Sequence, residues 1–471
     1  QPDSFIEFSA HDIAFKAGSK VVAPGAKITL TATDRLSDPL QGSHGQISIE
    51  DDSVIDVSGI RGVNVAMERH VGEVNVKSNE LRDSPNQRNS VLRNAIVKVD
   101  ARKKTEIIDT SVATSGIKRS VFERMTQGGE ITMTASGQVD VQNGALIDIS
   151  GGSVDIAGGS IKTTYLINEA GQMVEISDAN PDEKYVGLTE QEFFEAGYSE
   201  GKDAGVLQLK TADLQWNGNL DASVINGRKQ RTAQTMARGG EFSIDLAVFN
   251  ATQNIAINNG EAFSRLALSG LQDFSLKTWG EVSVANDVSL AFKPLSNIAI
   301  EAGSIKIKGD LYTAGGDIHF TAKRNVALNT SGELFVGGNA VLDVSGRWIN
   351  DQLTVNRGIN PTEAVVINGG SVALSAAGDL TTEQGSEIKA NGGAWLANGD
   401  NDVNAGKGGD ITLEALGVGA TPSLLFLGAK LSAQALHENG RLTLASNKFV
   451  ISDHTRTDVD SRTNFCRLNT L

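Results

Sequence analysis

The chain has 471 residues, of which 42 are Lys or Arg and 57 are Asp or Glu, so its net charge is −15. This acidic balance argues against a general nucleic-acid-binding protein, which needs a basic face, and we expect no nucleic-acid partner. Cys466 is the only cysteine, so we expect no disulfide framework and no cofactor of the zinc-ribbon or iron–sulfur type. No run approaches the roughly 20 apolar residues of a membrane helix, so we expect no membrane insertion.

Residues 1–80 begin a series of short predicted strands. In the segment Val54–Gly59, apolar Ile55 and Val57 alternate with Asp56, which predicts a half-buried strand that runs into a turn. The same pattern returns at 146–151 and at 341–346. We therefore expect 1–80 to form the first β coils of a repetitive fold.

Residues 81–127 interrupt this alternation, because ten Lys and Arg stand there against five Asp and Glu. We interpret the stretch as a basic insert that leaves the β coils. On an otherwise acidic chain such a concentration of cations could bind acidic glycans, for example sulfated polysaccharide, although a solvated loop is the other interpretation. The candidate glycan contacts are Arg88, Arg93, Lys98, Arg102, Lys103, Lys104, Lys118 and Arg119.

Residues 128–162 resume the strand pattern with a glycine corner. The sequence Gly-Gly-Glu-Ile-Thr-Met begins at Gly128, and related copies begin at Gly239, Gly315, Gly369 and Gly408. Each copy places a glycine pair before alternating apolar and polar residues, which is typical of a short strand after a turn.

Residues 163–205 form a second polar insert in this interpretation. Thr189 with Glu192 three positions later matches a helix capping box, and Gly197 provides a stop signal. The sequence therefore predicts a short helix within this insert.

Residues 206–454 carry the main run of strands, and 455–471 lack alternation and are expected to form a loose tail. Because no convincing amphipathic segment separates the strands, the pattern predicts an all-β parallel β-solenoid with two extra-helical inserts. At roughly 20 to 25 residues per coil, about 15 coils would stack about 4.8 Å apart.

These residues resemble a known family. The elements at 128–133 and 147–152, and the run LRDSPNQRNS at 81–90, are similar to filamentous haemagglutinin-like exoproteins, large adhesins that Gram-negative bacteria export by two-partner secretion. The resemblance covers most of 40–450 and implies a right-handed parallel β-helix, a secreted or cell-surface location and an outer-membrane transporter as partner. It implies no catalytic residue. The family's N-terminal secretion motifs of the Asn-Pro-Asn type are not in this sequence.

We therefore expect a non-enzymatic structural and adhesive segment of a surface adhesin, whose two inserts contact glycans or proteins of cells, matrix or biofilm. The chain starts without an initiator Met or an apolar export signal, so we expect it to be a fragment of the β-helical region of a longer protein. Two alternatives are a polysaccharide-active β-helix enzyme and the stalk of a contact-dependent toxin.

Three outward-facing carboxylates are the candidates for the enzyme alternative, because such enzymes gather acids for acid/base chemistry. They are Asp56, Asp148 and Asp343, and their wide separation along the chain predicts several coils between them. The other interpretation, which the Asp-x-Ser-Gly pattern favours, is that each carboxylate hydrogen-bonds its own turn.

One segment resembles a calcium loop in part. Asp400, Asp402 and Asn404 have the spacing of the first half of such a loop. Ala405 and Ile411 stand where the completing glycine and bidentate glutamate are needed. We therefore favour a solvated turn and expect no metal site.

Overall fold

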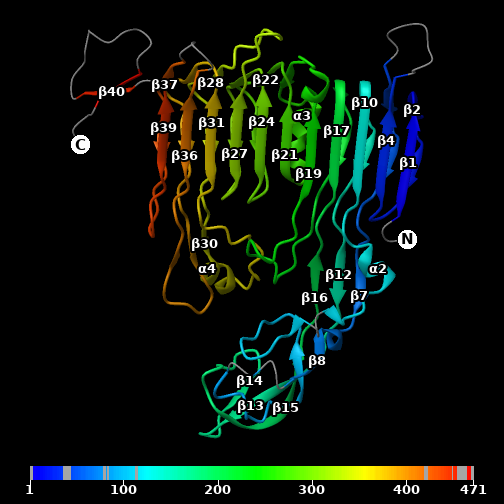
Figure 1. Ribbon diagram of the computed structural model, residues 1–471, viewed down its shortest axis with the longest axis vertical. Coiled ribbons are helices and arrows are strands. Elements are labelled where there is room, and N and C mark those ends of the chain that lie inside the picture. The colour runs from blue at the N-terminus through cyan, green and yellow to red at the C-terminus, as the bar shows by residue number, and fades with distance from the viewer. Residues whose placement is uncertain are drawn as a thin grey trace. The chain divides into compact units, whose positions relative to one another are not determined.

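The computed structural model describes residues 4–34, 44–77, 81, 84–111, 115–417, 423–447, 449–452 and 464–467, the last two as backbone. The protein is mostly β, with 45% strand and 6% helix. It divides into two compact units (Figure 1). The large unit comprises Gln1–Ile60, Met125–Gly152 and Gly201–Leu471, and the small unit comprises Arg61–Arg124 and Ser153–Glu200.

Long parallel sheets stacked in sequence order build the large unit, an arrangement consistent with a β-solenoid. Among the described residues, the main sheet follows a path of eleven parallel strands (Figure 1). They are β1 (Phe5–Ala10), β4 (Lys27–Ala32), β10 (Glu130–Val141), β17 (Val206–Trp216), β19 (Gly240–Asp245), β21 (Leu271–Lys277), β24 (Asn297–Ala302), β27 (Asp317–Ala322), β31 (Ser371–Ala376), β36 (Ile411–Ala415) and β39 (Leu442–Ser446). β2 (Asp12–Phe15) and β5 (Gln46–Ile49) extend this sheet beside β10.

Eleven strands are fewer than the roughly 15 coils expected from a repeat of about 20 to 25 residues. The small unit takes two long segments, Arg61–Arg124 and Ser153–Glu200, out of the stack. Some coils are also long, since β27 ends at Ala322 and β31 starts only at Ser371. Such loops lengthen a coil without adding a strand to the main sheet.

Shorter parallel sheets form the remaining sides of the large unit. One contains β3 (Lys20–Val22), β6 (Val54–Asp56), β11 (Leu146–Asp148) and β18 (Asn219–Asp221). A second contains β20 (Ile255–Ile257), β22 (Glu281–Val284), β25 (Ser304–Ile307), β28 (Leu334–Val336), β32 (Leu380–Thr382) and β37 (Leu425–Leu427). A third contains β23 (Ser289–Ala291), β26 (Asp310–Tyr312), β29 (Val341–Asp343), β33 (Glu387–Lys389) and β38 (Lys430–Ser432).

A few elements lie between these sheets. β30 (Trp348–Asn350) pairs in parallel with β34 (Ala394–Leu396), which pairs in antiparallel fashion with β35 (Asn404–Ala405). The described helices of the large unit are short: η2 (Ala247–Phe249), α3 (Ala262–Arg265), η3 (Leu266–Leu268) and α4 (Asp351–Asn356).

Inward side chains of successive strands form apolar columns. Ile131 of β10 stands in register with Ile28 of β4 and Leu207 of β17, and Leu207 stands in register with Phe242 of β19. All four side chains are fully buried. Because strands in a sheet lie about 4.8 Å apart, each apolar residue contacts its counterparts above and below, and the alternation in sequence becomes a continuous core.

The glycine corners are explained by close backbone contact between successive coils. A Cβ placed on Gly370 would lie 1.7 Å from the carbonyl oxygen of Gly316, and one on Gly409 would lie 1.7 Å from that of Gly370. No side chain fits at these distances, so the second glycine of the repeated pair is a packing requirement rather than a demand for an unusual φ.

The small unit has two antiparallel sheets, a third sheet in which β7 (Val63–Val65) and β12 (Ser153–Ile156) are parallel, and its own core. β13 (Gly159–Asn168) lies between β14 (Met173–Glu175) and β15 (Tyr185–Glu195), and β8 (Val71–Asn75) pairs with β9 (Ile96–Asp100). The third sheet joins β7, β12 and β16 (Tyr198–Gly201), and the described helices are η1 (Met67–His70) and α2 (Val121–Arg124). The core draws on both segments, with Val97, Val99 and Leu92 from one and Leu166, Ile176 and Tyr185 from the other.

The two predicted inserts, 81–127 and 163–205, thus fall largely within one unit whose segments start earlier than expected, at Arg61 and Ser153. The helix predicted from Thr189 to Gly197 is wrong, because β15 occupies this stretch up to Glu195. Glu192 pairs across the sheet with Lys162 of β13 instead of capping a helix. Tertiary pairing outweighs the local capping signal here.

The predicted loose tail, 455–471, contains a strand. β41 (Asn464–Arg467) pairs in parallel with β40 (Phe449–Ser452). Residues 455–463 and 468–471, and the side chain of Cys466, lie outside the part of the chain that the structure describes.

Candidate functional site

The basic stretch that the sequence singles out belongs to the small unit, where an acidic segment offsets its charge. Residues 61–124 contain 13 Lys and Arg against 8 Asp and Glu, whereas 153–200 contain 2 against 10. The unit as a whole therefore has 15 basic and 18 acidic residues. Folding brings the two charge excesses together, so much of the basic character is used inside the unit.

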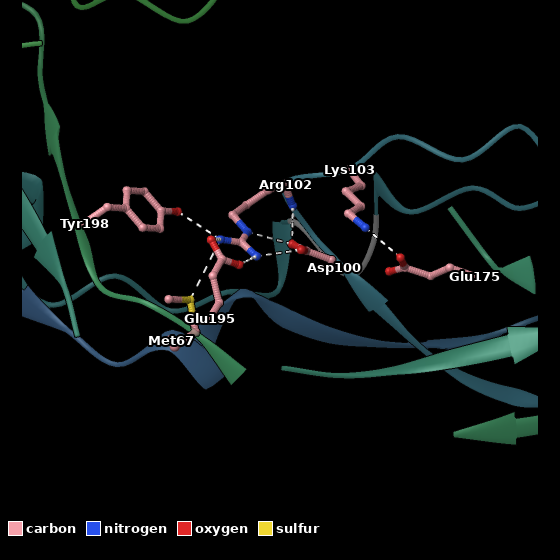
Figure 2. Close-up of polar contacts among 7 residues, drawn as sticks. All are labelled: Met67, Asp100, Arg102, Lys103, Glu175, Glu195 and Tyr198. Carbon is pink, nitrogen blue, oxygen red and sulfur yellow. Dashed lines mark hydrogen bonds and ion pairs between the residues drawn. The ribbon is translucent and has the colours of Figure 1, made fainter. Parts of the chain in front are cut away.

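Arg102 is the centre of this pairing (Figure 2). Its Nε donates to Oδ1 of Asp100 at 2.9 Å, and its Nη2 donates to Oδ2 of Asp100 at 2.7 Å and to Oε2 of Glu195 at 2.8 Å. Nη1 donates to the Tyr198 hydroxyl at 3.0 Å. Arg102 therefore links β9 to the ends of β15 and β16, and the N–H donors of its guanidinium group bond to acceptors within the unit.

The protonation states of this cluster follow from burial and charge. Burial raises the pKa of Asp100, but its hydrogen bonds from Arg102 outweigh that effect and hold the pKa below its usual value. The hydrogen bonds that Arg102 donates to Asp100, and after them those to Glu195, raise the pKa of Arg102. Burial, aided by the positive charge of Arg102, lowers the pKa of neighbouring His70.

Two further candidate contacts are also paired internally. Lys103 Nζ lies 2.6 Å from Oε2 of Glu175 (Figure 2). Lys98 Nζ lies 3.1 Å from Oε1 of Glu190, whose other oxygen lies 2.6 Å from Nζ of Lys162. Three of the eight candidate glycan contacts thus form ion pairs that hold the small unit together.

The other five candidates, Arg88, Arg93, Lys104, Lys118 and Arg119, are exposed on the small unit. The loop that carries Arg88 is fixed by its neighbour Gln87, whose buried amide donates to the carbonyl oxygens of Pro181 and Glu183 at 2.9 and 2.6 Å. Arg88 is therefore presented by an ordered loop, which reduces the entropy lost on binding a ligand.

The candidate carboxylates of the large unit are closer together than expected. Asp56 stands in register with Asp148, and Asp148 with Asp221, on three neighbouring strands. The expectation of several coils between Asp56 and Asp148 is wrong, because the small unit's first segment accounts for most of the intervening chain. Asp221 was missed, although the sequence Leu-Asp-Ala-Ser at 220–223 is a weakened copy of the motif. Asp343 lies in a different sheet, on β29.

The aspartates of this column, Asp56, Asp148 and Asp221, each accept a hydrogen bond from the backbone of the turn that follows. Ser58, Ser150 and Ser223 donate their backbone N–H groups to Asp56, Asp148 and Asp221 at 2.8, 2.9 and 2.9 Å. Asp343 accepts the same bond from Ser345 at 2.9 Å, which confirms the turn interpretation. Burial raises the pKa of Asp148, and the charges of Asp221 and Asp56 add to the rise against the opposing Ser150 bonds.

The partial calcium loop lies on a hairpin. Asp400 and Asp402 are exposed in the connection between β34 and β35, and Asn404 belongs to β35. Within the described ranges, no group of three or more His, Cys, Asp or Glu side chains is arranged to hold a metal ion.

Comparison with known proteins finds no matching family model, no matching curated protein and no matching solved structure. Among the described residues, no helix has the length and apolar character needed to cross a membrane.

Proposed function

We propose that this chain is a non-enzymatic structural segment of an exported bacterial surface adhesin, in which the large unit is a stiff scaffold and the small unit is a contact module for glycans or proteins of cells, matrix or biofilm. The proposal includes a right-handed parallel β-helix for the large unit and an outer-membrane transporter as secretion partner. It rests on the sequence resemblance to filamentous haemagglutinin-like exoproteins together with the division of the chain into two units.

One observation carries the proposal. The parallel ladder of the large unit continues past both places where the small unit's segments leave it, because β10 pairs in unbroken register from Glu130 to Ala135 with β4 before it and β17 after it. The two long excursions fold around a core of their own. The large unit can therefore act as the stiff scaffold while the small unit contacts a ligand. Because a stack of parallel coils is stabilised by contacts between neighbouring coils, it can carry such excursions without losing its own stability.

The test compares the intact chain with a chain in which 61–124 and 153–200 are both replaced by short Gly/Ser linkers. Both proteins are applied to a broad glycan array and to immobilised matrix proteins. Saturable binding by the intact chain that is lost from the excised chain supports a contact module. Equal binding by both would assign contact to the large unit, and sugar release from an array polysaccharide would favour the enzyme alternative.

A further inference from the structure

A groove on the small unit has features of a sugar-binding site. It has a volume of about 380 Å³ and is open to solvent. One wall is the end of η1 and the start of β8, and the other is the segment 116–118. The residues that line it are Arg69, Val71, Gly72, Glu73, Gly116, Ile117 and Lys118.

An ion pair and a capping box hold the two walls in place. Arg69 of the first wall forms an ion pair with Glu123 of α2, which follows the second wall. Glu123 also accepts the backbone N–H of Ser120 at 2.7 Å, and Ser120 Oγ accepts that of Glu123 at 3.2 Å. Burial works against ionisation of Glu123, but the bonds from Arg69 and Ser120 keep its pKa lowered. The groove is therefore preformed by charged partners that stay ionised at neutral pH.

The lining offers three kinds of contact. Val71 and Ile117 are half-buried apolar side chains, and the neighbouring Gly116 is exposed and has no side chain. β8 pairs with β9 on one edge, and no described strand pairs with its other edge, so backbone donors and acceptors remain there. These are contacts for the C–H face and the hydroxyl groups of a sugar.

The charges select among sugars. Lys118 is exposed, and in the described part of the chain it makes no ion pair or hydrogen bond, so its ammonium is available to an anion. Glu73, also exposed on the opposite wall, can accept hydrogen bonds from hydroxyl groups but repels further negative charge. We propose that this groove binds a single carboxylated sugar residue, of the uronic-acid type, within a glycan chain. The proposal rests on the proposed function and names the ligand class of its contact module.

The same charges disfavour a densely sulfated polyanion. The small unit has an excess of three acidic residues, and three of its eight candidate basic contacts are already neutralised by internal partners. A ligand with several sulfates on each disaccharide would bring many negative charges to this acidic unit, whereas a carboxylated sugar places one carboxylate in the groove, where Lys118 can pair with it.

The experiment measures binding of the intact chain to short oligogalacturonate and to short hyaluronan fragments by calorimetry. The variants are Lys118→Gln and, as the matched control, Lys77→Gln, an exposed lysine of the same unit that lies outside the groove and is not a candidate glycan contact. Loss of one charge-assisted contact should weaken binding roughly tenfold in Lys118→Gln. Lys77→Gln should bind like the unmodified chain. The unmodified chain should bind the methyl ester of oligogalacturonate about as weakly as Lys118→Gln binds the acid. Affinity for the methyl ester should be the same in Lys118→Gln as in the unmodified chain.

Absence of binding by both acidic probes would overturn the inference, as would equal affinities for the acid and its methyl ester or equal effects of the two lysine variants. These results are separable from a failure of the proposed function. Array binding that is lost on excision of the small unit but unchanged in Lys118→Gln would leave the contact module standing and remove this groove as its site.

Discussion

The backbone N–H of Ile60 donates to the carbonyl oxygen of Met125 at 2.8 Å, although the whole segment Arg61–Arg124 of the small unit lies between them in the sequence. A second bond of this kind joins the N–H of Lys202 to the carbonyl oxygen of Gly152 at 3.0 Å. The chain therefore leaves and rejoins the large unit at neighbouring positions both times. A short linker can bridge each gap without moving the strands on either side.

The first prediction concerns removal of both small-unit segments. A chain with 61–124 and 153–200 replaced by Gly/Ser linkers should fold, because the columns of the large unit use no side chain from these segments. Trp216, Trp279, Trp348 and Trp395 are the four tryptophans, and all lie in the large unit. The urea midpoint for unfolding of the doubly excised chain, followed by tryptophan fluorescence, should match that of the intact chain.

The matched control removes 61–124 alone. The remaining segment then exposes Leu166, Ile176 and Tyr185, which are buried against residues of the missing segment. This protein should aggregate or bind a hydrophobic dye more strongly than the doubly excised chain. Similar behaviour of the two variants would contradict a core shared between the segments.

The second prediction concerns Arg102. Replacement by Gln leaves the carboxylate of Asp100, whose side chain is 1% exposed, without its partner, and this should cost the small unit about 3–5 kcal/mol. Amide exchange of β9 in the intact chain should accelerate by roughly 100-fold or more. Arg119→Gln, a change at an exposed arginine, should leave exchange nearly unchanged.

The same network predicts an acid transition. The pKa of Asp100 is lowered from 3.8 in the folded protein, so its contribution to stability is present above that value and is lost as pH falls through the folded pKa. Protection of β9 should therefore decline at strongly acid pH in the unmodified chain. The decline should be smaller in Arg102→Gln, where the stabilising bonds are already absent.

The third prediction concerns the glycine corner. A methyl group at Gly370 would lie 1.7 Å from the carbonyl oxygen of Gly316, so Gly370→Ala must push two coils apart and should strongly destabilise the large unit. Gly337→Ala is the control, because its new methyl group meets nothing nearer than 3.3 Å, the flexible side chain of Lys308. Urea midpoints that are equal for the two variants would refute the packing explanation of the repeat.

The fourth prediction concerns the aspartate column. The pKa of Asp148 is raised above 3.8, so the ionised carboxylate costs stability, and this cost grows as pH rises through the folded pKa. Asp148→Asn keeps the oxygen that Ser150 bonds and removes the charge, so it should stabilise the protein at pH 7 and have little effect near pH 3. Asp148→Ala loses the turn bond and should be less stable than Asp148→Asn by about 1 kcal/mol. A midpoint of Asp148→Asn below that of the unmodified chain at pH 7 would contradict repulsion within the column.

The parallel sheets were predictable because their determinants are local. Each glycine pair is followed by alternating residues, so inward positions such as Ile131 and Phe242 can be read directly from the sequence. The small unit was not predictable in the same way, since its core and its ion pairs join segments far apart in the sequence. Glu190 illustrates the difficulty: it lies within a local helix signal, but its partners are Lys98 and Lys162 on two other strands. The excess of acids in 153–200 beside the basic 61–124 was the one available sign of that pairing.

We propose that the small unit makes the contacts with glycans or proteins and that the large unit provides the stiffness. The most direct measurement is saturation binding of the intact and doubly excised chains to one glycan surface that the intact chain recognises, after fluorescence has verified that both large units are folded. We expect a saturable component of binding for the intact chain and none for the excised chain. The same affinity and capacity for both would contradict it.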